Sequence, residues 1–167
     1  LATTGVVGTL STGNGPTVGL RADMDALPIQ ETNSFGHRSR HDGKMHACGH
    51  DGHTTMLLGA ARYLAESQEF SGTIRFIFQP AEEAAGGAKV MMDDGLFELF
   101  PVGAVFGRHN WPGLAVGRFA MRPGPMMASL DYFDIVVEGL GAHGALPHQG
   151  VDTVHDAAQV ITALQSI

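Results

Sequence analysis

Residues 45–53, with the sequence MHACGHDGH, concentrate the side chains of this chain that are best suited to chemistry. This histidine–cysteine cluster carries three of the nine histidines and the single cysteine, Cys48. A thiolate and imidazoles held this closely together are typical ligands of a transition metal. A lone cysteine cannot form a disulfide within the chain, so its place among histidines favours metal binding. The alternative is a buried apolar cysteine beside solvated histidines, and the cluster alone leaves it open.

Further polar side chains follow three apolar segments that we expect to be strands. Asp23 and Asp25 come after the first segment, Glu82 and Glu83 after the second, and His109 after the third. Ligands in open α/β sheets bind at the carboxyl ends of the strands. The histidine–cysteine cluster lies directly before a predicted helix. We therefore expect four separate segments to deliver metal-binding side chains to one edge of the sheet.

The residue types at this edge suit a divalent cation. Cys48 and His50, together with Glu83 and His109, make a set of donors that fits zinc, manganese or a related ion. Adjacent carboxylates can divide their roles, one binding metal and the other remaining free as a base. Asp25 is suited to holding an imidazole by its second ring nitrogen. The competing interpretations are a solvated pair of glutamates and a charged turn after a strand.

The elements that must position these residues alternate between strand and helix. Residues 5–10 and 17–22 are short β-type runs separated by the turn-rich sequence STGNGP, which predicts a hairpin. Apolar residues at helical spacing predict a helix from residue 54 to about 67. Strands are expected at 73–79 and 103–109, with a helix at 87–93 between them. This order favours an α/β fold with a partly parallel sheet.

A change in composition follows residue 110. Residues 111–127 are rich in Gly, Pro and Met and could cross between domains. A strand is expected at 130–139 and a helix at 152–166. One strand and one helix bury little surface, so we expect a first domain at 1–124 and only the beginning of a second at 125–167.

Composition and charge exclude several classes of protein. The 167 residues are 44% apolar and 16% charged, which fits a folded domain rather than a disordered chain. The net charge of −7 argues against a nucleic-acid partner. No apolar run is long enough to span a bilayer, so we expect no membrane partner. The single cysteine favours a reducing, cytoplasmic setting, and the opening sequence LATTGVVGTL, which has no signal peptide, indicates a fragment.

Six short motifs give the sequence a specific resemblance. In chain order they are RADMDALP, GKMHACGHDGH, FQPAEE, HNWPG, GPMMAS and GAHGALPH. The chain resembles the M20 metallopeptidase family, most closely its amidohydrolase branch of hippurate, N-acyl-amino-acid and auxin-conjugate hydrolases. The resemblance implies a di-metal α/β catalytic domain with a mixed sheet, followed by a ferredoxin-like α+β lid domain through which the full-length protein would form a homodimer.

The resemblance also implies a role for individual residues. The expected activity is hydrolysis of the amide bond of small N-acyl amino acids by a water activated by two divalent ions, Mn²⁺ or Zn²⁺, with Co²⁺ or Ni²⁺ also suitable. Glu82 matches the general base, and His143 of the lid matches a histidine that stabilises the reacting carbonyl. Asp25 matches an aspartate that orients the metal site. The implied metal ligands are Cys48, His50, Glu83 and His109.

The other histidines receive weaker expectations. His148 is expected to have a structural role. The remaining ones are expected to be solvated or, at best, to support the ligands; they are His37, His41, His46, His53 and His155.

The sequence also departs from the family pattern. No residue after His155 can supply the further histidine ligand that the family carries. Arg108 replaces an apolar residue, and Gly103 a residue that is commonly acidic; the charge of Arg108 would either weaken metal binding or point outward. A non-catalytic fragment or degenerate relative that binds metal or dimerises is therefore the alternative. A di- or aminopeptidase is disfavoured, because those branches carry an aspartate where Cys48 stands.

Overall fold

The computed structural model describes residues 1–83 and 86–167. These residues form two compact units, Leu1–Val116 and Gly117–Ile167. The division at residues 124 and 125 that the sequence suggests stays a prediction.

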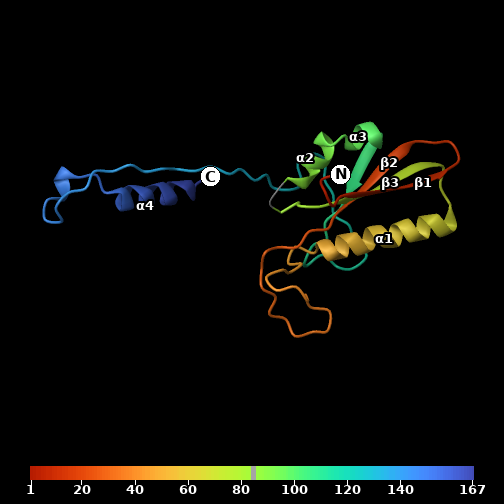
Figure 1. The fold of residues 1–167 in the computed structure, drawn as a ribbon, viewed down its shortest axis with the longest axis horizontal. Helices are drawn as coiled ribbons and strands as arrows, with labels where there is room; N and C mark the ends of the chain where they lie inside the picture. The colour runs from red at the N-terminus through yellow and green to blue at the C-terminus, as the bar shows by residue number, and fades with distance from the viewer. Residues whose placement is uncertain (84–85) are drawn as a thin grey trace. The chain divides into compact units, whose positions relative to one another are not determined.

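The first unit is built on a four-stranded mixed sheet (Figure 1). β2 runs parallel to β3 and to β4, whereas β1 runs antiparallel to β3. The predicted α/β class with a partly parallel sheet is therefore confirmed. In spatial order the strands are β1 (Val6–Thr12), β3 (Gly72–Gln79), β2 (Thr17–Asp23) and β4 (Ala104–Gly107).

The predicted hairpin between the first two strands is wrong, because β3 lies between β1 and β2. β3 is the most buried strand of the sheet, and a central position covers both of its edges and both of its faces. The turn-rich segment after β1 passes over the start of β3 instead of closing a hairpin. There Ser71 Oγ donates to the carbonyl of Asn14, and the Thr73 N–H donates to the carbonyl of Pro16.

Helices cover both faces of this sheet (Figure 1). α1 (His50–Ser67) packs on one face, where Leu57 joins Ile74 and Phe76 of β3 in a buried apolar cluster. α2 (Gly87–Asp93) and α3 (Leu96–Leu99) cover the other face, where Met91 and Leu96 pack on Ile77. Successive side chains of β3 point to opposite faces of the sheet, so the strand contributes to both apolar clusters. In the described part of the chain, no helix is long and apolar enough to cross a membrane.

α1 begins at His50, four residues before its predicted start. The chain enters it through Gly49, which has a φ of 87° in the left-handed region that favours glycine. His50 is thus the first residue of a helix rather than part of an extended loop. As a consequence, His50 and His53 lie three residues apart on one face of the helix, and both are buried.

The second unit contains a short 3₁₀ helix, η1 (Pro147–Gln149), and α4 (Thr153–Leu164). α4 agrees with the helix expected at 152–166, and the Asp152 side chain caps it by accepting from the N–H groups of Val154 and His155. The strand expected at 130–139 does not form. A strand needs a neighbour to pair its backbone, and the described residues of this unit offer only a single bridge between Leu140 and Val151.

Candidate metal centre

The parallel strands explain why distant parts of the sequence meet at one edge. Asp23, the last residue of β2, is in register with Gln79, the last residue of β3. β4 joins the same edge, since Arg21 of β2 is in register with Gly107. The segments after these strands therefore emerge together, and they carry Asp25, the two glutamates and His109.

The structure brings all four predicted ligands together. Cys48 precedes α1, His50 opens it, Glu83 follows β3 and His109 follows β4. Cys48 Sγ lies 3.4 Å from His109 Nε2, and His50 Nε2 lies 3.7 Å from Glu83 Oε1. Donor atoms of Cys48, His50 and His109 all lie within 4.8 Å of one another, as do donor atoms of His50, Glu82 and Glu83 and those of Asp23, His50 and His53. His50 thus belongs to all three groups and stands at the centre.

The Nε2 atom of His50 faces three carboxylate groups. It lies 3.7 Å from Asp23 Oδ2, 3.8 Å from Glu82 Oε2 and 3.7 Å from Glu83 Oε1. Both His50 Nε2 and Glu83 Oε1 are buried without a hydrogen-bond partner among the residues that the structure describes. Buried polar atoms are nearly always paired, and 3.7 Å is too long for a hydrogen bond. A cation between these two atoms would satisfy both, so the residues fit a metal.

The other ring nitrogen of His50 is held by Asp25. Nδ1 lies 3.1 Å from the Asp25 carbonyl and 3.2 Å from Asp25 Oδ1. Both partners are acceptors, so Nδ1 carries the hydrogen and Nε2 keeps its lone pair for a metal. Asp25 Oδ2 also accepts the N–H of Glu83. One carboxylate therefore orients two of the predicted ligands.

The charge state of Asp25 follows from these contacts. Burial acts to raise the pKa of its carboxyl, but the backbone N–H groups of Glu83 and Glu82 and the nearby His50 lower it, and the net pKa lies below the ordinary value. The ionised form is the one that accepts hydrogen bonds on both oxygens.

The environment of Cys48 is strongly negative. Burial, followed by the hydrogen bond and charge of Glu83 and the charges of Glu82 and Asp23, raises the pKa of its thiol to about 11. A cluster of like charges opposes a thiolate but attracts a cation, and metal coordination deprotonates a thiol. The donor set and its charge thus agree in favouring a bound divalent ion.

Glu82 differs from its neighbour in exposure. Its side chain is 42% exposed, against 23% for Glu83. The two adjacent glutamates therefore occupy different environments: Glu83 turns a buried oxygen toward His50, and Glu82 stands at the more open side of the centre. This arrangement leaves the Glu82 carboxylate accessible to solvent.

His53 and Asp23 lie close to the centre, and the sequence analysis assigned neither of them a firm role. His53 was expected to be either solvated or, at best, a support for the ligands. It is 2% exposed, so it is buried and not solvated. Its Nδ1 lies 2.5 Å from Oδ1 of Asp23, which is also 2% exposed. A predicted helix that began at His50 would have placed His50 and His53 on one helical face, because they are three residues apart.

The remaining predicted residues are exposed. Arg108 is exposed, so its charge is not buried among the ligands. His143 belongs to the second unit, where it is exposed and its Nδ1 accepts the N–H of Ala145. His148 is exposed in η1. The other histidines are exposed as expected; they are His37, His41, His46 and His155.

Comparison with known proteins makes the class specific. Residues 19–166 match the model of peptidase family M20/M25/M40. The match extends over most of the sequence, and the chain belongs to this family.

Individual relatives are similar over nearly the whole chain. It is 53% identical over 165 residues to a hippurate hydrolase of Campylobacter jejuni, covering 98% of this chain and 43% of that protein. It is 52% identical over 154 residues to an N-acetyl-L-cysteine deacetylase of Bacillus subtilis, covering 92% of this chain and 36% of that protein. The chain thus spans about two fifths of the length of these curated relatives.

A solved structure supports the fold and the presence of metal in the family. A dinuclear metal binding peptidase of the M20 family from Bacillus subtilis is similar with a TM-score of 0.64 and 47% sequence identity. The similarity covers 68% of this chain and 32% of that one.

Proposed function

We propose that the protein carrying this chain is a metal-dependent amidohydrolase that cleaves the amide bond of N-acyl amino acids. The observation that carries the proposal is the buried pair of His50 Nε2 and Glu83 Oε1, which are 3.7 Å apart and unpaired among the described residues. Relatives that are named for hippurate and N-acetyl-L-cysteine support the substrate class.

We assign Cys48, His50, Glu83 and His109 as the side chains that hold the metal. They supply one sulfur, two imidazole nitrogens and one carboxylate, a mixture that several divalent ions accept. We propose two ions, Mn²⁺ or Zn²⁺, with Co²⁺ and Ni²⁺ as further candidates. The dinuclear metal binding relative supports the number.

The reaction needs a base and a stabilised oxyanion in addition to the cations. Bound divalent ions supply Lewis-acid polarisation of the amide carbonyl and make a water molecule more acidic. Glu82 accepts the proton of the attacking water and then donates it to the nitrogen of the departing amine. Asp25 keeps the His50 ring in its orientation throughout, because it holds Nδ1.

The second unit supplies a further proposal. We assign His143 as a donor to the oxyanion that develops on the carbonyl, a contribution that is typically worth about 3–4 kcal/mol for one well-placed donor. The exposed position of His143 leaves its ring free to meet a substrate. We also propose that the protein forms a homodimer through its lid domain and that it acts in the cytoplasm, which its single cysteine favours.

Hydrolysis of small N-acyl amino acids tests this function directly. The full-length protein is purified, stripped with a chelator and assayed on N-benzoylglycine and N-acetyl amino acids before and after addition of Mn²⁺ or Zn²⁺. Activity that disappears on stripping and returns with metal supports the proposal. Tight metal binding without hydrolysis of any of these amides would instead support the non-catalytic alternative.

A further inference from the structure

A string of buried and part-buried hydrogen bonds runs beside the candidate metal centre without using any of the four assigned ligands. At its middle, His53 Nδ1 lies 2.5 Å from Asp23 Oδ1. On the other side of the ring, the backbone N–H of Asn110 donates to His53 Nε2 at 2.9 Å. Asn110 directly follows His109, so this bond fastens the segment that carries one assigned ligand to the helix that carries another.

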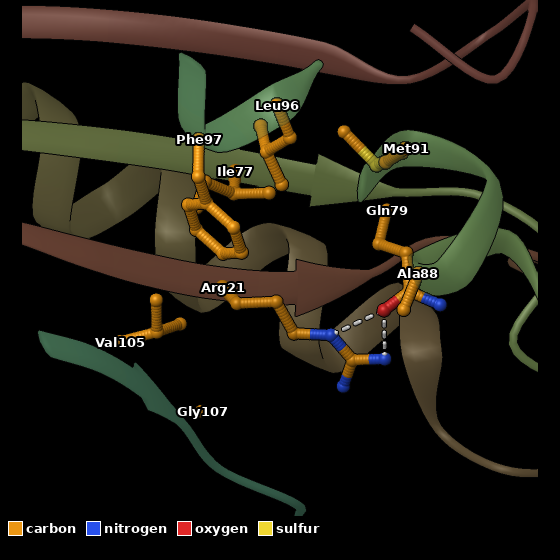
Figure 2. A pocket seen from close by; sticks show the side chains of 9 residues that line it. All are labelled: Arg21, Ile77, Gln79, Ala88, Met91, Leu96, Phe97, Val105 and Gly107. Atoms are coloured by element: carbon orange, nitrogen blue, oxygen red, sulfur yellow. Dashed lines mark hydrogen bonds between the residues drawn. The ribbon is translucent and has the colours of Figure 1, made fainter. Parts of the chain in front are cut away.

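The string continues across the sheet. Arg21 donates to Asp23 Oδ2 at 2.8 Å and, through Nε, to Gln79 Oε1 at 2.8 Å. Figure 2 shows this Arg21–Gln79 contact at a pocket lined by residues of β2, β3, β4, α2 and α3. Asp23 and Gln79 are the last residues of β2 and β3. The hydrogen bonds therefore link the ends of two strands to α1 and to the segment after β4.

Asn110 makes a second attachment to the entrance of α1. Its Nδ2 donates to the carbonyl of Gly49 at 3.2 Å. Gly49 stands between Cys48 and His50, and a Cβ atom at this position would come within 2.5 Å of the Asn110 side chain. The turn that carries Cys48 and His50 is thus packed closely against Asn110, the residue that follows His109.

The ring of His53 is fully engaged in these contacts. The Asp23 carboxylate accepts, so Nδ1 carries a hydrogen; the neutral ring then accepts the Asn110 N–H on Nε2. A protonated ring would instead donate Nε2–H to Asn110 Oδ1, which lies 3.0 Å away. In both states Asn110 occupies Nε2, so His53 has no lone pair to offer a metal.

We infer that His53 is a positioning residue that, by holding Asn110, sets the place of His109 opposite Cys48. His109 Nε2 lies 3.4 Å from Cys48 Sγ, and the bond from Asn110 to His53 begins one residue further along the chain. The inference rests on the proposed metal site, because it concerns the position of two of its ligands.

Two substitutions test the hydrogen bonds on the two sides of the His53 ring separately. In His53→Gln, the side-chain carbonyl can reach the position of Nε2 and accept the Asn110 N–H. In His53→Asn, the shorter amide can donate to Asp23 from the position of Nδ1 but cannot reach Asn110. His41→Asn is the matched control, since His41 is exposed in a loop.

The experiment measures Zn²⁺ affinity and the visible spectrum of the Co²⁺ form of the full-length protein, with the thermal unfolding of each metal-free variant as a measure of folding. We expect His53→Asn to lose about 10- to 100-fold in affinity, as residues that orient ligands do, and to change the Co²⁺ spectrum. His53→Gln should stay closer to the wild type, and His41→Asn should equal it. Equal loss in both His53 variants, or no loss in either, would overturn the inference.

The result also separates this inference from the proposed function. If the wild-type protein binds no metal, the proposed function fails; if it binds metal and both His53 variants bind equally well, only the inference fails. Should neither His53 variant fold, Asn110→Pro decides, because proline has no backbone N–H to donate to His53; Asn110→Ala, which keeps this N–H, is its control. About tenfold weaker metal binding in Asn110→Pro than in Asn110→Ala would support the positioning role, and equal affinity in the two variants would overturn it.

Discussion

His50 Nε2 and Glu83 Oε1 lie 3.7 Å apart at the edge of the sheet, both buried and both without a hydrogen-bond partner among the described residues. The opposite nitrogen of His50 is held by Asp25, which fixes the direction of the ring. A buried polar atom without a partner costs about 1–3 kcal/mol. Such a pair is therefore best explained by a ligand that both atoms share, and a divalent cation meets the requirement of each.

Replacement of Glu82 tests the separation of metal binding from proton transfer. Glu82→Gln keeps the shape of the side chain but removes the basic carboxylate. We expect turnover to fall by about 100- to 10,000-fold, the usual contribution of a general base, while metal content stays unchanged. Metal analysis and steady-state hydrolysis of an N-acyl amino acid check both parts. Unchanged turnover would refute the assignment of the base.

Cys48 can be tested by spectroscopy. A thiolate bound to Co²⁺ gives a near-ultraviolet charge-transfer band that nitrogen and oxygen ligands do not give. We expect this band in the Co²⁺ form of the wild-type protein and expect Cys48→Ser to abolish it. Cys48 is the single cysteine of these 167 residues. A band that persists in Cys48→Ser would therefore come from a thiolate elsewhere and would contradict the assignment of Cys48.

The entrance to α1 gives a prediction for stability. Gly49→Ala places a side chain at φ 87°, where its Cβ would also meet Asn110. We expect the free energy of unfolding to fall by about 1–2 kcal/mol from the backbone alone, with a further loss from the clash. Gly59→Ala is the control on the same helix, because its Cβ would meet no atom within 4 Å. There alanine should stabilise by about 0.5–1 kcal/mol, as measured by denaturant unfolding.

A pH-dependent contact lies in the loop before the histidine–cysteine cluster. Hydrogen bonds from Asn33 and from the Ser39 N–H lower the pKa of Glu31 below its ordinary value of 4.5. A lowered pKa in the folded state means that this stabilisation is present above the unfolded pKa and is lost as pH falls through the folded value. Amide exchange at Ser39 should therefore accelerate, relative to the unfolded rate, on acidification below about pH 4.5. In Glu31→Gln the protection of Ser39 should not vary with pH over this range.

The edge of the sheet could be predicted because it depends on local patterns. The apolar runs at 17–22, 73–79 and 103–109 indicate strands, and parallel pairing then places the residues at their ends together. The position of His109 at the same edge as Asp25 and the two glutamates follows from this reasoning without knowledge of the strand order. The prediction needed only that the three strands share a sheet and a direction.

Other features depend on contacts that local patterns do not record. Insertion of β3 between β1 and β2 is decided by the burial of β3 on both sides, while the intervening turn sequence favours a hairpin. The start of α1 at His50 depends on the left-handed Gly49 and its packing against Asn110. The role of His53 depends in turn on that start, since only a helical turn brings it to Asp23.

Anomalous diffraction from crystals of the full-length protein loaded with Mn²⁺ or Zn²⁺ tests the proposed metal site most directly. We expect anomalous peaks within bonding distance of Cys48 Sγ, His50 Nε2, His109 Nε2 and a carboxylate oxygen of Glu83. We expect no peak in contact with His53. Peaks at other side chains, or a loaded crystal with no peak among these four residues, would contradict the proposed site.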